Sequence, residues 1–316
     1  MVATTKKKKS PGFFETKIKP LAYKRIRLIR LMSQVFFTGL FFGGLFGLSR
    51  TAVPVPAVVP AGAEYATVWG GLDMLLYTLT RGHFPFLILG VFFLSGVLFG
   101  RTACGWMCPF GLWQDVLSWV PVKKKEVKRE DNEAFAEIGG TILWILILVS
   151  IFIGFYKYIF GVDQPLADGP YTVIPWAPWD PAGILFVSLY EILRWGLIEG
   201  KSVFQILSTF SFYFWLRFSF LTLIAVLGIF YPRSYCRWIC PTGALLGYCS
   251  KYSILTISRD PLRCDSGCDR CEKACPMGVP ILSNDPERIA DSMCINCGAC
   301  IDACGPNKAL SFKFHF

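Results

Sequence analysis

Eight of the thirteen cysteines in this chain stand in two runs of four near the C-terminal end. The second run has the spacing C-x2-C-x2-C-x3-C, and the first differs by one extra residue after its first cysteine. Three closely spaced thiolates can wrap one face of an iron–sulfur cubane, and a fourth closes it. The spacing therefore predicts two [4Fe–4S] clusters. The runs are Cys264, Cys268, Cys271 and Cys275, followed by Pro276, and Cys294, Cys297, Cys300 and Cys304.

Two other uses of cysteine fit this pattern poorly. A disulfide framework belongs to small domains in oxidising compartments, and zinc sites favour two C-x2-C pairs separated by a longer loop. In ferredoxins with two clusters, the fourth cysteine of each run serves the other cluster. We therefore expect crossed ligation. One site would consist of Cys264, Cys268, Cys271 and Cys304, and the other of Cys294, Cys297, Cys300 and Cys275.

The rest of the chain has the composition of a membrane protein. It is 53% hydrophobic and 17% charged, with a mean hydropathy of +0.47, whereas soluble domains carry about 25% charged residues. Four stretches approach the length of about 20 apolar residues that crosses a bilayer. They cover residues 28–48, 84–99, 138–160 and 203–230. A fifth stretch, 182–197, contains Glu191 and Arg194, and we expect it to lie at the membrane interface as an amphipathic helix.

Basic residues predict the orientation of these spans. Lys6 to Lys9 and further cations precede the first span, and Lys123 to Arg129 separate the second from the third. The positive-inside rule then places both termini and the middle loop in the cytoplasm, where thiols also stay reduced. The net charge of +10 gathers in these blocks, so it does not indicate nucleic-acid binding. The first span is too long for the apolar core of a typical signal peptide.

The second and fourth spans end in the same motif. Residues 101–111 and 233–243 share Arg, two Cys in a C-x3-C-P arrangement, Trp and Gly at a constant offset. Such a parallel repeat predicts that the two motifs meet at the cytoplasmic face. If each segment were helical, C-x3-C would place both sulfurs on one face. Four thiolates together would bind iron–sulfur or zinc; the alternative is two local turns with reduced thiols. The four are Cys104, Cys108, Cys236 and Cys240.

The expected fold is a bundle of four membrane helices in two parallel repeats, with amphipathic outer helices and a small α+β ferredoxin domain. We predict a basic N-terminal segment (1–27), a first membrane repeat (28–122), a basic linker (123–137), a second membrane repeat (138–253) and a domain with two clusters (254–316).

Two C-x3-C-P motifs after membrane spans, followed by two ferredoxin runs, resemble the NapH and NosR group of membrane polyferredoxins, and NapH-type proteins most closely. The stretch Gly82-His83-Phe84-Pro85 is also similar to that group. NosR and its large relatives carry an outer domain, for which this chain has no room, and CcoG-type proteins share parts of the pattern. The resemblance implies electron transfer between membrane quinol and a periplasmic reductase, with ferredoxin-like or cytochrome partners.

Other cofactors have little support in the sequence. The chain has two histidines, no C-x-x-C-H and no P-loop or dinucleotide motif, so we expect neither haem nor nucleotide. His83 is a candidate to bind a quinone; the alternative is a histidine satisfied at a helix start. Arg101 and Arg233 would stabilise thiolates or anchor the helix ends. Cys249 is expected to be a buried structural thiol. The acids Asp163, Asp168 and Asp180 are expected to be solvated, near the interfacial Trp176 and Trp179.

Together these features predict an electron-transfer subunit of a quinone-linked complex in the cytoplasmic membrane, rather than a stand-alone enzyme. Its partners would be the membrane, the quinone pool and redox subunits. Two alternatives remain open. The chain could be a maturation factor whose clusters reduce a metal for a respiratory enzyme, or an anchor that docks a larger enzyme.

Overall fold

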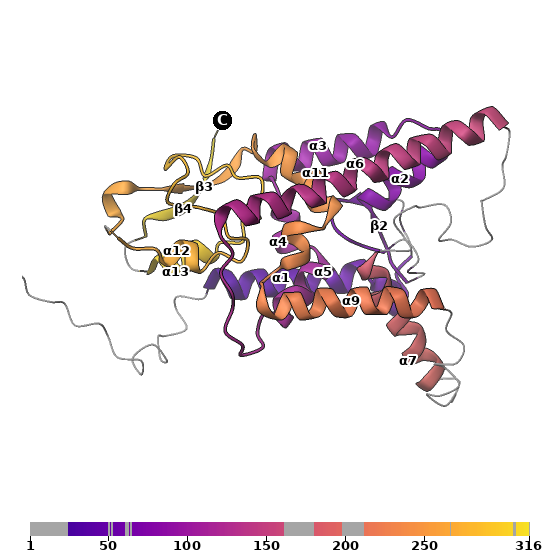
Figure 1. The fold of residues 1–316 in the computed structure, drawn as a ribbon, viewed down its shortest axis with the longest axis horizontal. Coiled ribbons are helices and arrows are strands. Elements are labelled where there is room, and N and C mark those ends of the chain that lie inside the picture. Colours follow the sequence, from indigo (N-terminus) through magenta and orange to yellow (C-terminus); the bar gives the residue numbers. More distant parts are fainter. Residues whose placement is uncertain are drawn as a thin grey trace, which may run out of the picture.

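A computed structural model describes residues 25–49, 51, 53–60, 63, 65–160, 180–197, 212–265, 267–305 and 308–315. The fold is mostly helical, with a small domain of two strands and short helices at one end of the helical part (Figure 1). In that view α1 and α9 run along one side of the helical part, and α3 and α6 run along the other. The expectation of a helical body with a small C-terminal ferredoxin-like domain is thus confirmed.

The first half begins with α1 (Arg25–Phe41), which is followed by the 3₁₀ helix η2 (Gly43–Phe46). The expected helix over 28–48 therefore ends early. The reason is a close backbone approach, because a Cβ on Gly44 would lie 2.5 Å from the carbonyl oxygen of Tyr65. The half continues with β1 (Pro54–Val55), which pairs in parallel with β2 (Trp69–Gly70), and with α2 (Gly71–Thr80), α3 (Phe86–Phe99), α4 (Thr102–Trp106) and α5 (Pro109–Leu117).

The second half repeats the end of the first. It contains α6 (Arg129–Phe160), the π-helix η4 (Gly183–Ser188), α7 (Leu189–Leu197), α9 (Phe212–Phe230), α10 (Ser234–Trp238) and α11 (Pro241–Ser250). A long helix, a five-residue helix and a helix that starts with proline follow one another in α3–α4–α5 and in α9–α10–α11. Helices of the two halves pack together, α11 against α3 and α5 against α9, and within the second half α11 also packs against α6.

One helix of the described residues, α6, is long and apolar enough to cross a membrane. Shorter apolar helices cover Phe86–Phe99 and Phe214–Phe230. Residues 203–211 of the expected fourth span lie outside the described residues, as do Asp163, Asp168, Trp176 and Trp179 of the expected outer loop. The number of spans therefore stays a prediction.

The C-terminal domain is framed by two strands. Strand β3 (Leu255–Arg259) pairs antiparallel with β4 (Leu310–Phe314), with Ile257 opposite Phe312. Between the strands lie the 3₁₀ helix η5 (Pro261–Arg263), α12 (Arg270–Lys273) and α13 (Ala299–Cys304), and α12 packs against α13. Both cysteine runs lie between β3 and β4 in the sequence, so the pairing of these two strands closes the domain around the runs.

Candidate metal centre

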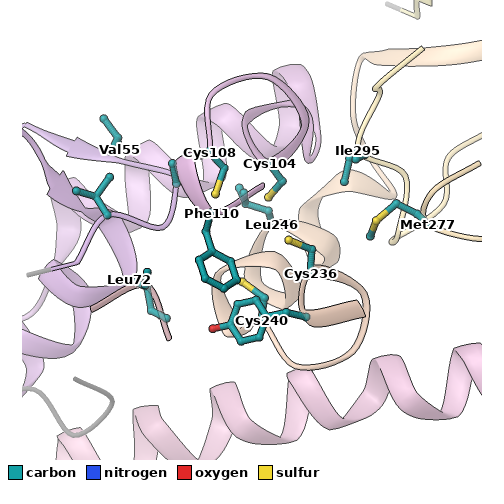
Figure 2. Packing of buried hydrophobic residues seen from close by; sticks show 14 of the residues in the cluster. Val55, Leu72, Cys104, Cys108, Phe110, Cys236, Cys240, Leu246, Met277 and Ile295 are labelled. Carbon is teal, nitrogen blue, oxygen red and sulfur yellow. The ribbon is translucent and has the colours of Figure 1, made fainter. Parts of the chain in front are cut away.

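The four cysteines of the two C-x3-C-P motifs meet in the centre of the helical part. Figure 2 shows their sulfur atoms between the segments of the two repeats, with Phe110 beside them and Met277 and Ile295 of the C-terminal domain on the side of Cys104 and Cys236. All four are buried, with between 2% and 6% of each residue exposed. We call this group the cysteine tetrad. It consists of Cys104, Cys108, Cys236 and Cys240.

Proline gives each motif its shape. Cys108 and Cys240 have extended backbones, as expected before a proline, and Pro109 and Pro241 open the next helix, where a missing N–H costs nothing. Each motif therefore spans a short helix and the start of another, and it is not the single helix considered from its spacing. The chain turns at each second cysteine, so both thiols of a motif point toward the opposite repeat.

Burial raises the pKa values of thiols in the tetrad. Burial, together with the neighbouring Cys104, raises the pKa of Cys108 to about 11. Burial also raises the pKa of Cys236 well above its usual value. Buried thiols of this kind stay protonated unless a metal takes the place of the proton. Within the described ranges, no three His, Cys, Asp or Glu side chains are close enough to share one metal ion.

Two arginines cross between the repeats beside the tetrad. Arg101 of the first repeat donates from Nη2 to the carbonyl oxygen of Cys236 at 2.9 Å. Arg233 of the second repeat donates from Nη1 to the carbonyl oxygen of Cys104 at 3.0 Å. Both side chains are buried, so neither is the surface anchor that the sequence left open. Each arginine holds the first cysteine of the other motif.

The shared glycine of the two motifs makes room for this crossing. A Cβ on Gly243 would overlap Nη2 of Arg101. A Cβ on Gly111 would lie 2.9 Å from the carbonyl oxygen of Cys104 and 3.6 Å from Nη2 of Arg233. The Arg, Cys and Gly of each motif thus take part in the same contact: the arginine of one repeat binds the first cysteine of the other, next to a glycine.

An acid completes the arrangement around Arg233. Asp115 on α5 accepts hydrogen bonds from Nε and Nη2 of Arg233 at 2.9 and 2.6 Å, and Arg30 on α1 lies 3.1 Å from the same carboxylate. Burial raises the pKa of Asp115, but the two guanidinium groups outweigh this effect and hold it below its usual value. Asp115 is a functional residue that was not predicted from the sequence, because no local pattern links it to a residue so distant in the chain.

The C-terminal domain brings three cysteines of the second run to one of the first. Cys294, Cys297 and Cys300 line an enclosed apolar cavity together with Cys275. Burial raises the pKa of Cys275 to about 11, and the nearby Cys297 adds to the increase. This is the grouping expected from crossed ligation, and the apolar walls suit a cluster shielded from water. We call it the inner site.

The remaining cysteines form a more open group, the outer site. Cys264 and Cys268 line a surface cavity, and Cys264 contributes to the raised pKa of Cys271, which burial causes in the first place. Cys304 ends α13, the helix that packs against α12, which carries Cys271. The extra residue of the first run is absorbed by a bend at Gly267, whose φ of +79° is easy for glycine.

The tetrad and the inner site are neighbours. A Cβ on Gly105 would lie 2.6 Å from the carbonyl oxygen of Ile295, so α4 touches the loop of the second cysteine run directly. Burial lowers the pKa of Arg233 but Asp115 raises it above its usual value, and Cys236 of the tetrad and Cys297 of the inner site act in the same direction. Arg233 therefore lies between the two groups of thiols.

Asn132 and Trp106 attach the domain to the helices. Oδ1 of Asn132 accepts from Arg237 and Trp238, and its Nδ2 donates to the carbonyl oxygen of Met277 at 3.3 Å. Nε1 of Trp106 donates to the carbonyl oxygen of Asn296 at 2.9 Å. Trp106 thus contacts the domain directly, and Trp238 acts through Asn132 of α6, roles that their repetition alone did not indicate.

Three other predicted residues lie away from the tetrad or differ from expectation. His83 is exposed between α2 and α3, and it is separated from the tetrad by α3, a helix of 14 residues that spans about 21 Å. Cys249 is half-buried on α11 against Gly96. Asp180, expected to be solvated, is buried and accepts from the backbone N–H groups of Ala182 and Gly183 at the start of a helix.

Two family models match this chain. One, described as a 4Fe-4S binding domain, matches residues 81–128 and 212–257, which contain the two C-x3-C-P motifs. The other, described as a 4Fe-4S dicluster domain, matches residues 256–305. The first match covers the tetrad, and the second covers both ferredoxin runs.

Several curated proteins are similar to this chain. An uncharacterized protein of Methanocaldococcus jannaschii is 28% identical over 68% of this chain and 65% of its own length, so the chain spans just under two thirds of that relative. The ferredoxin-type protein NapH of Escherichia coli is 25% identical over 88% of this chain and 85% of its own. The methylamine utilization ferredoxin-type protein MauN of Paracoccus denitrificans is 27% identical over 63% and 56%.

No solved structure matches this chain. The family models and the relatives support electron transfer through iron–sulfur clusters. The match to NapH covers most of both chains. Over most of its length the chain is therefore similar to a ferredoxin-type protein of the NapH kind, and its matched regions are those of 4Fe-4S binding domains.

Proposed function

We propose that this chain is the electron-transfer subunit of a quinone-linked complex in the cytoplasmic membrane, and that it uses three clusters. The observation that carries the proposal is the contact between the tetrad and the inner site, made through Gly105 and Arg233. The inner site shares the small C-terminal domain with the outer site. Electrons would pass from the tetrad to the inner site and then to the outer site, or in reverse, and leave to a redox partner.

Four helices would cross the membrane in this proposal: α1, α3, α6 and α9. Large apolar side chains cover the exposed surface of α6, among them Leu148, Phe152 and Phe155, each more than 60% exposed. Such a surface is stable against lipid and unusual against water. The basic residues before α6, including Lys123 and Lys128, would keep that end in the cytoplasm. Together with the basic N-terminal segment, this would place both termini there.

The residues of the chain would control the tetrad in two ways. A [4Fe–4S] cluster supplies one-electron transfer, and its potential depends on net charge, hydrogen bonds and exposure. Phe110 and Leu246 are fully buried in the same core as the four thiols and exclude water. Arg101 and Arg233 bring positive charge beside the thiolates, which favours the more negative, reduced state.

Iron content tests the third cluster. The Cys104→Ser variant is expected to hold about four irons fewer per chain than the wild type, one cubane, when both are prepared without oxygen. The control is Cys249→Ser, which removes a cysteine of α11 outside the tetrad and should keep all the iron. Electron paramagnetic resonance of the reduced protein should still show both clusters of the C-terminal domain. Equal iron in the Cys104→Ser variant and the wild type would contradict the proposal.

A further inference from the structure

The two repeats differ at one position next to the crossing arginines. Asp115 and Gly247 stand at the same distance after the second cysteine of their motifs, Cys108 and Cys240. In the first repeat, Asp115 pairs with the crossing Arg233. In the second repeat, Gly247 offers no carboxylate to the crossing Arg101.

Arg101 consequently lacks the carboxylate partner that Arg233 has. Its guanidinium donates to the carbonyl oxygens of Ser292 and Cys236, but it makes no ion pair within the described part of the chain, and its Nε has no hydrogen-bond partner there. Only 4% of this residue is exposed. Buried charges are normally paired, because water cannot stabilise them. A group with an acceptor oxygen would complete this site.

A cavity of about 540 Å³ lies beside Arg101, between α6, α11 and residues 290–293. We call it the junction cavity. It reaches Cys236 and Cys240 of the tetrad, and Trp238 and Tyr248 are among its lining residues. Small side chains keep it open; a Cβ on Gly140, for example, would lie 2.7 Å from the hydroxyl of Tyr248. Its volume falls within the range of about 300–1,000 Å³ that is typical of small-molecule sites.

The charges around the cavity narrow the class of ligand. Three cations, Arg101, Arg237 and Lys251, face three acids, Glu133, Glu137 and Asp291. A balanced lining does not favour a phosphorylated nucleotide, whereas a neutral aromatic molecule with carbonyl oxygens fits it. The next turn of α6 beyond the cavity exposes Trp144 and Ile145, each more than half exposed, so an apolar tail could leave along this helix toward lipid.

We propose that the junction cavity binds the headgroup of a quinone, with Arg101 donating to one of its oxygens. This inference rests on the proposed quinone-linked function and adds the place where the quinone binds. Oxidation of one quinol releases two electrons and two protons. The electrons would leave one at a time past Cys236 and Cys240 and reduce two clusters by one electron each. Glu133 and Glu137 on the exposed side of α6 would take up the protons and release them to water.

A pair of tryptophan variants on α6 tests this placement. Ala136 lines the junction cavity, whereas Ala134 is exposed and does not line it. The probes are a short-chain naphthoquinol and a short-chain benzoquinol, added to the full chain in detergent with its clusters loaded. Cluster reduction is followed by absorbance, and binding of the oxidised probe by equilibrium dialysis. Ala136→Trp should weaken binding by about tenfold or more, and Ala134→Trp should behave as the wild type.

A third variant gives the second repeat the aspartate that the first repeat has at the equivalent position. Gly247→Asp gives Arg101 the carboxylate that Arg233 has, and it should also abolish quinone binding. Iron content and the spectrum after dithionite reduction must match the wild type in every variant that is compared, which shows that the clusters and the fold are intact. A loss in both Ala136→Trp and Gly247→Asp supports the site.

The outcomes separate this inference from the proposed function. If Ala136→Trp and Ala134→Trp bind and react alike, the junction cavity is not the quinone site, and reduction of their clusters by quinol then places that site elsewhere. If neither quinol reduces the wild type while dithionite does, the quinone link fails together with the site. If a flavin in place of a quinone binds to the wild type and is lost in Ala136→Trp, the cavity is a ligand site of another class, and the inference is wrong.

Discussion

Arg233 donates a hydrogen bond across the repeat boundary to the carbonyl oxygen of Cys104, and Arg101 returns the same bond to Cys236. The two motifs are therefore held by each other. This exchange explains why the arginine and the glycine recur with the cysteines, since each pair serves the opposite copy. It also identifies positions where a small change should affect the tetrad.

Replacing Arg233 with lysine should destabilise the protein. Lysine cannot make the two-pronged contact with Asp115 while also reaching Cys104, so the buried carboxylate keeps only Arg30 as a guanidinium partner. Breaking a buried pair in this way costs about 3–5 kcal/mol. Unfolding in detergent, followed by circular dichroism, measures the change. The control is Arg263→Lys, whose exposed pair with Asp260 should contribute less than about 1 kcal/mol. Equal stability of the two variants would show that the buried contact between Arg233 and Asp115 contributes no more than the exposed pair.

Alanine at Gly243 should disturb the tetrad without touching a cysteine. The added methyl group would displace the guanidinium of Arg101, because the two would overlap. Overpacking of this kind costs about 1–3 kcal/mol, and we expect the iron bound at the tetrad to be lost more readily. Gly90→Ala on α3 is the matched control, since a Cβ there meets nothing within 4 Å. A variant at Gly243 that retains its iron as Gly90→Ala does would show that Arg101 has room to move.

Crossed ligation predicts how cysteine variants will group. Cys275→Ser should alter the same spectroscopic signal as Cys294→Ser, because both line the inner site. Cys304→Ser should instead alter the signal that Cys264→Ser alters. Electron paramagnetic resonance of each variant at partial reduction separates the two clusters. Grouping by run, with Cys275 beside Cys271, would mean that each run binds its own cluster.

Asn132 should be essential for docking of the C-terminal domain. Its removal in Asn132→Ala leaves the buried donors of Arg237 and Trp238 without their acceptor, at about 1–3 kcal/mol for each unsatisfied group. Asn132→Asp keeps an acceptor and adds a charge opposite Arg237, so it should be milder. Limited proteolysis after Ser250 reports detachment of the domain. Similar cleavage rates for Asn132→Ala and the wild type would show that other contacts suffice.

Reporter fusions test the orientation. A cytoplasmic reporter fused after Phe316 should be active and a periplasmic one inactive, because basic residues mark the cytoplasmic side of the spans. The same result is expected for fusions in the loop that contains Lys125. An active periplasmic reporter at the C-terminus would contradict four spans with both termini in the cytoplasm.

The sequence was most informative where chemistry repeats. The matching C-x3-C-P motifs predicted that Cys104 and Cys236 would meet, and the structure brings them together. The predicted grouping of Cys275 with the second run also has a counterpart in the inner site. Both inferences depend on the spacing of cysteines within short motifs and on the clusters that thiolates at such spacing bind.

Contacts between distant segments could not be found in this way. Asp115 and Arg233 are 118 residues apart, and neither has a local partner that would mark the pair. The end of α1 at Phe41 was missed for a similar reason, because Gly44 is constrained by the backbone of Tyr65 and not by its own neighbours. Hydropathy predicted a continuous helix there, since all residues from 40 to 48 are apolar or glycine.

The exchange of arginines also constrains biosynthesis. The carbonyl oxygen that Arg101 binds belongs to a residue 135 positions later, and at about 5–20 residues per second the ribosome needs roughly 7–27 s to make that segment. During this interval the first motif has neither its partner thiols nor the acceptor of its arginine. Iron delivered before Cys240 has been synthesised would meet an incomplete set of ligands. Loading of the tetrad should therefore follow translation of the second repeat.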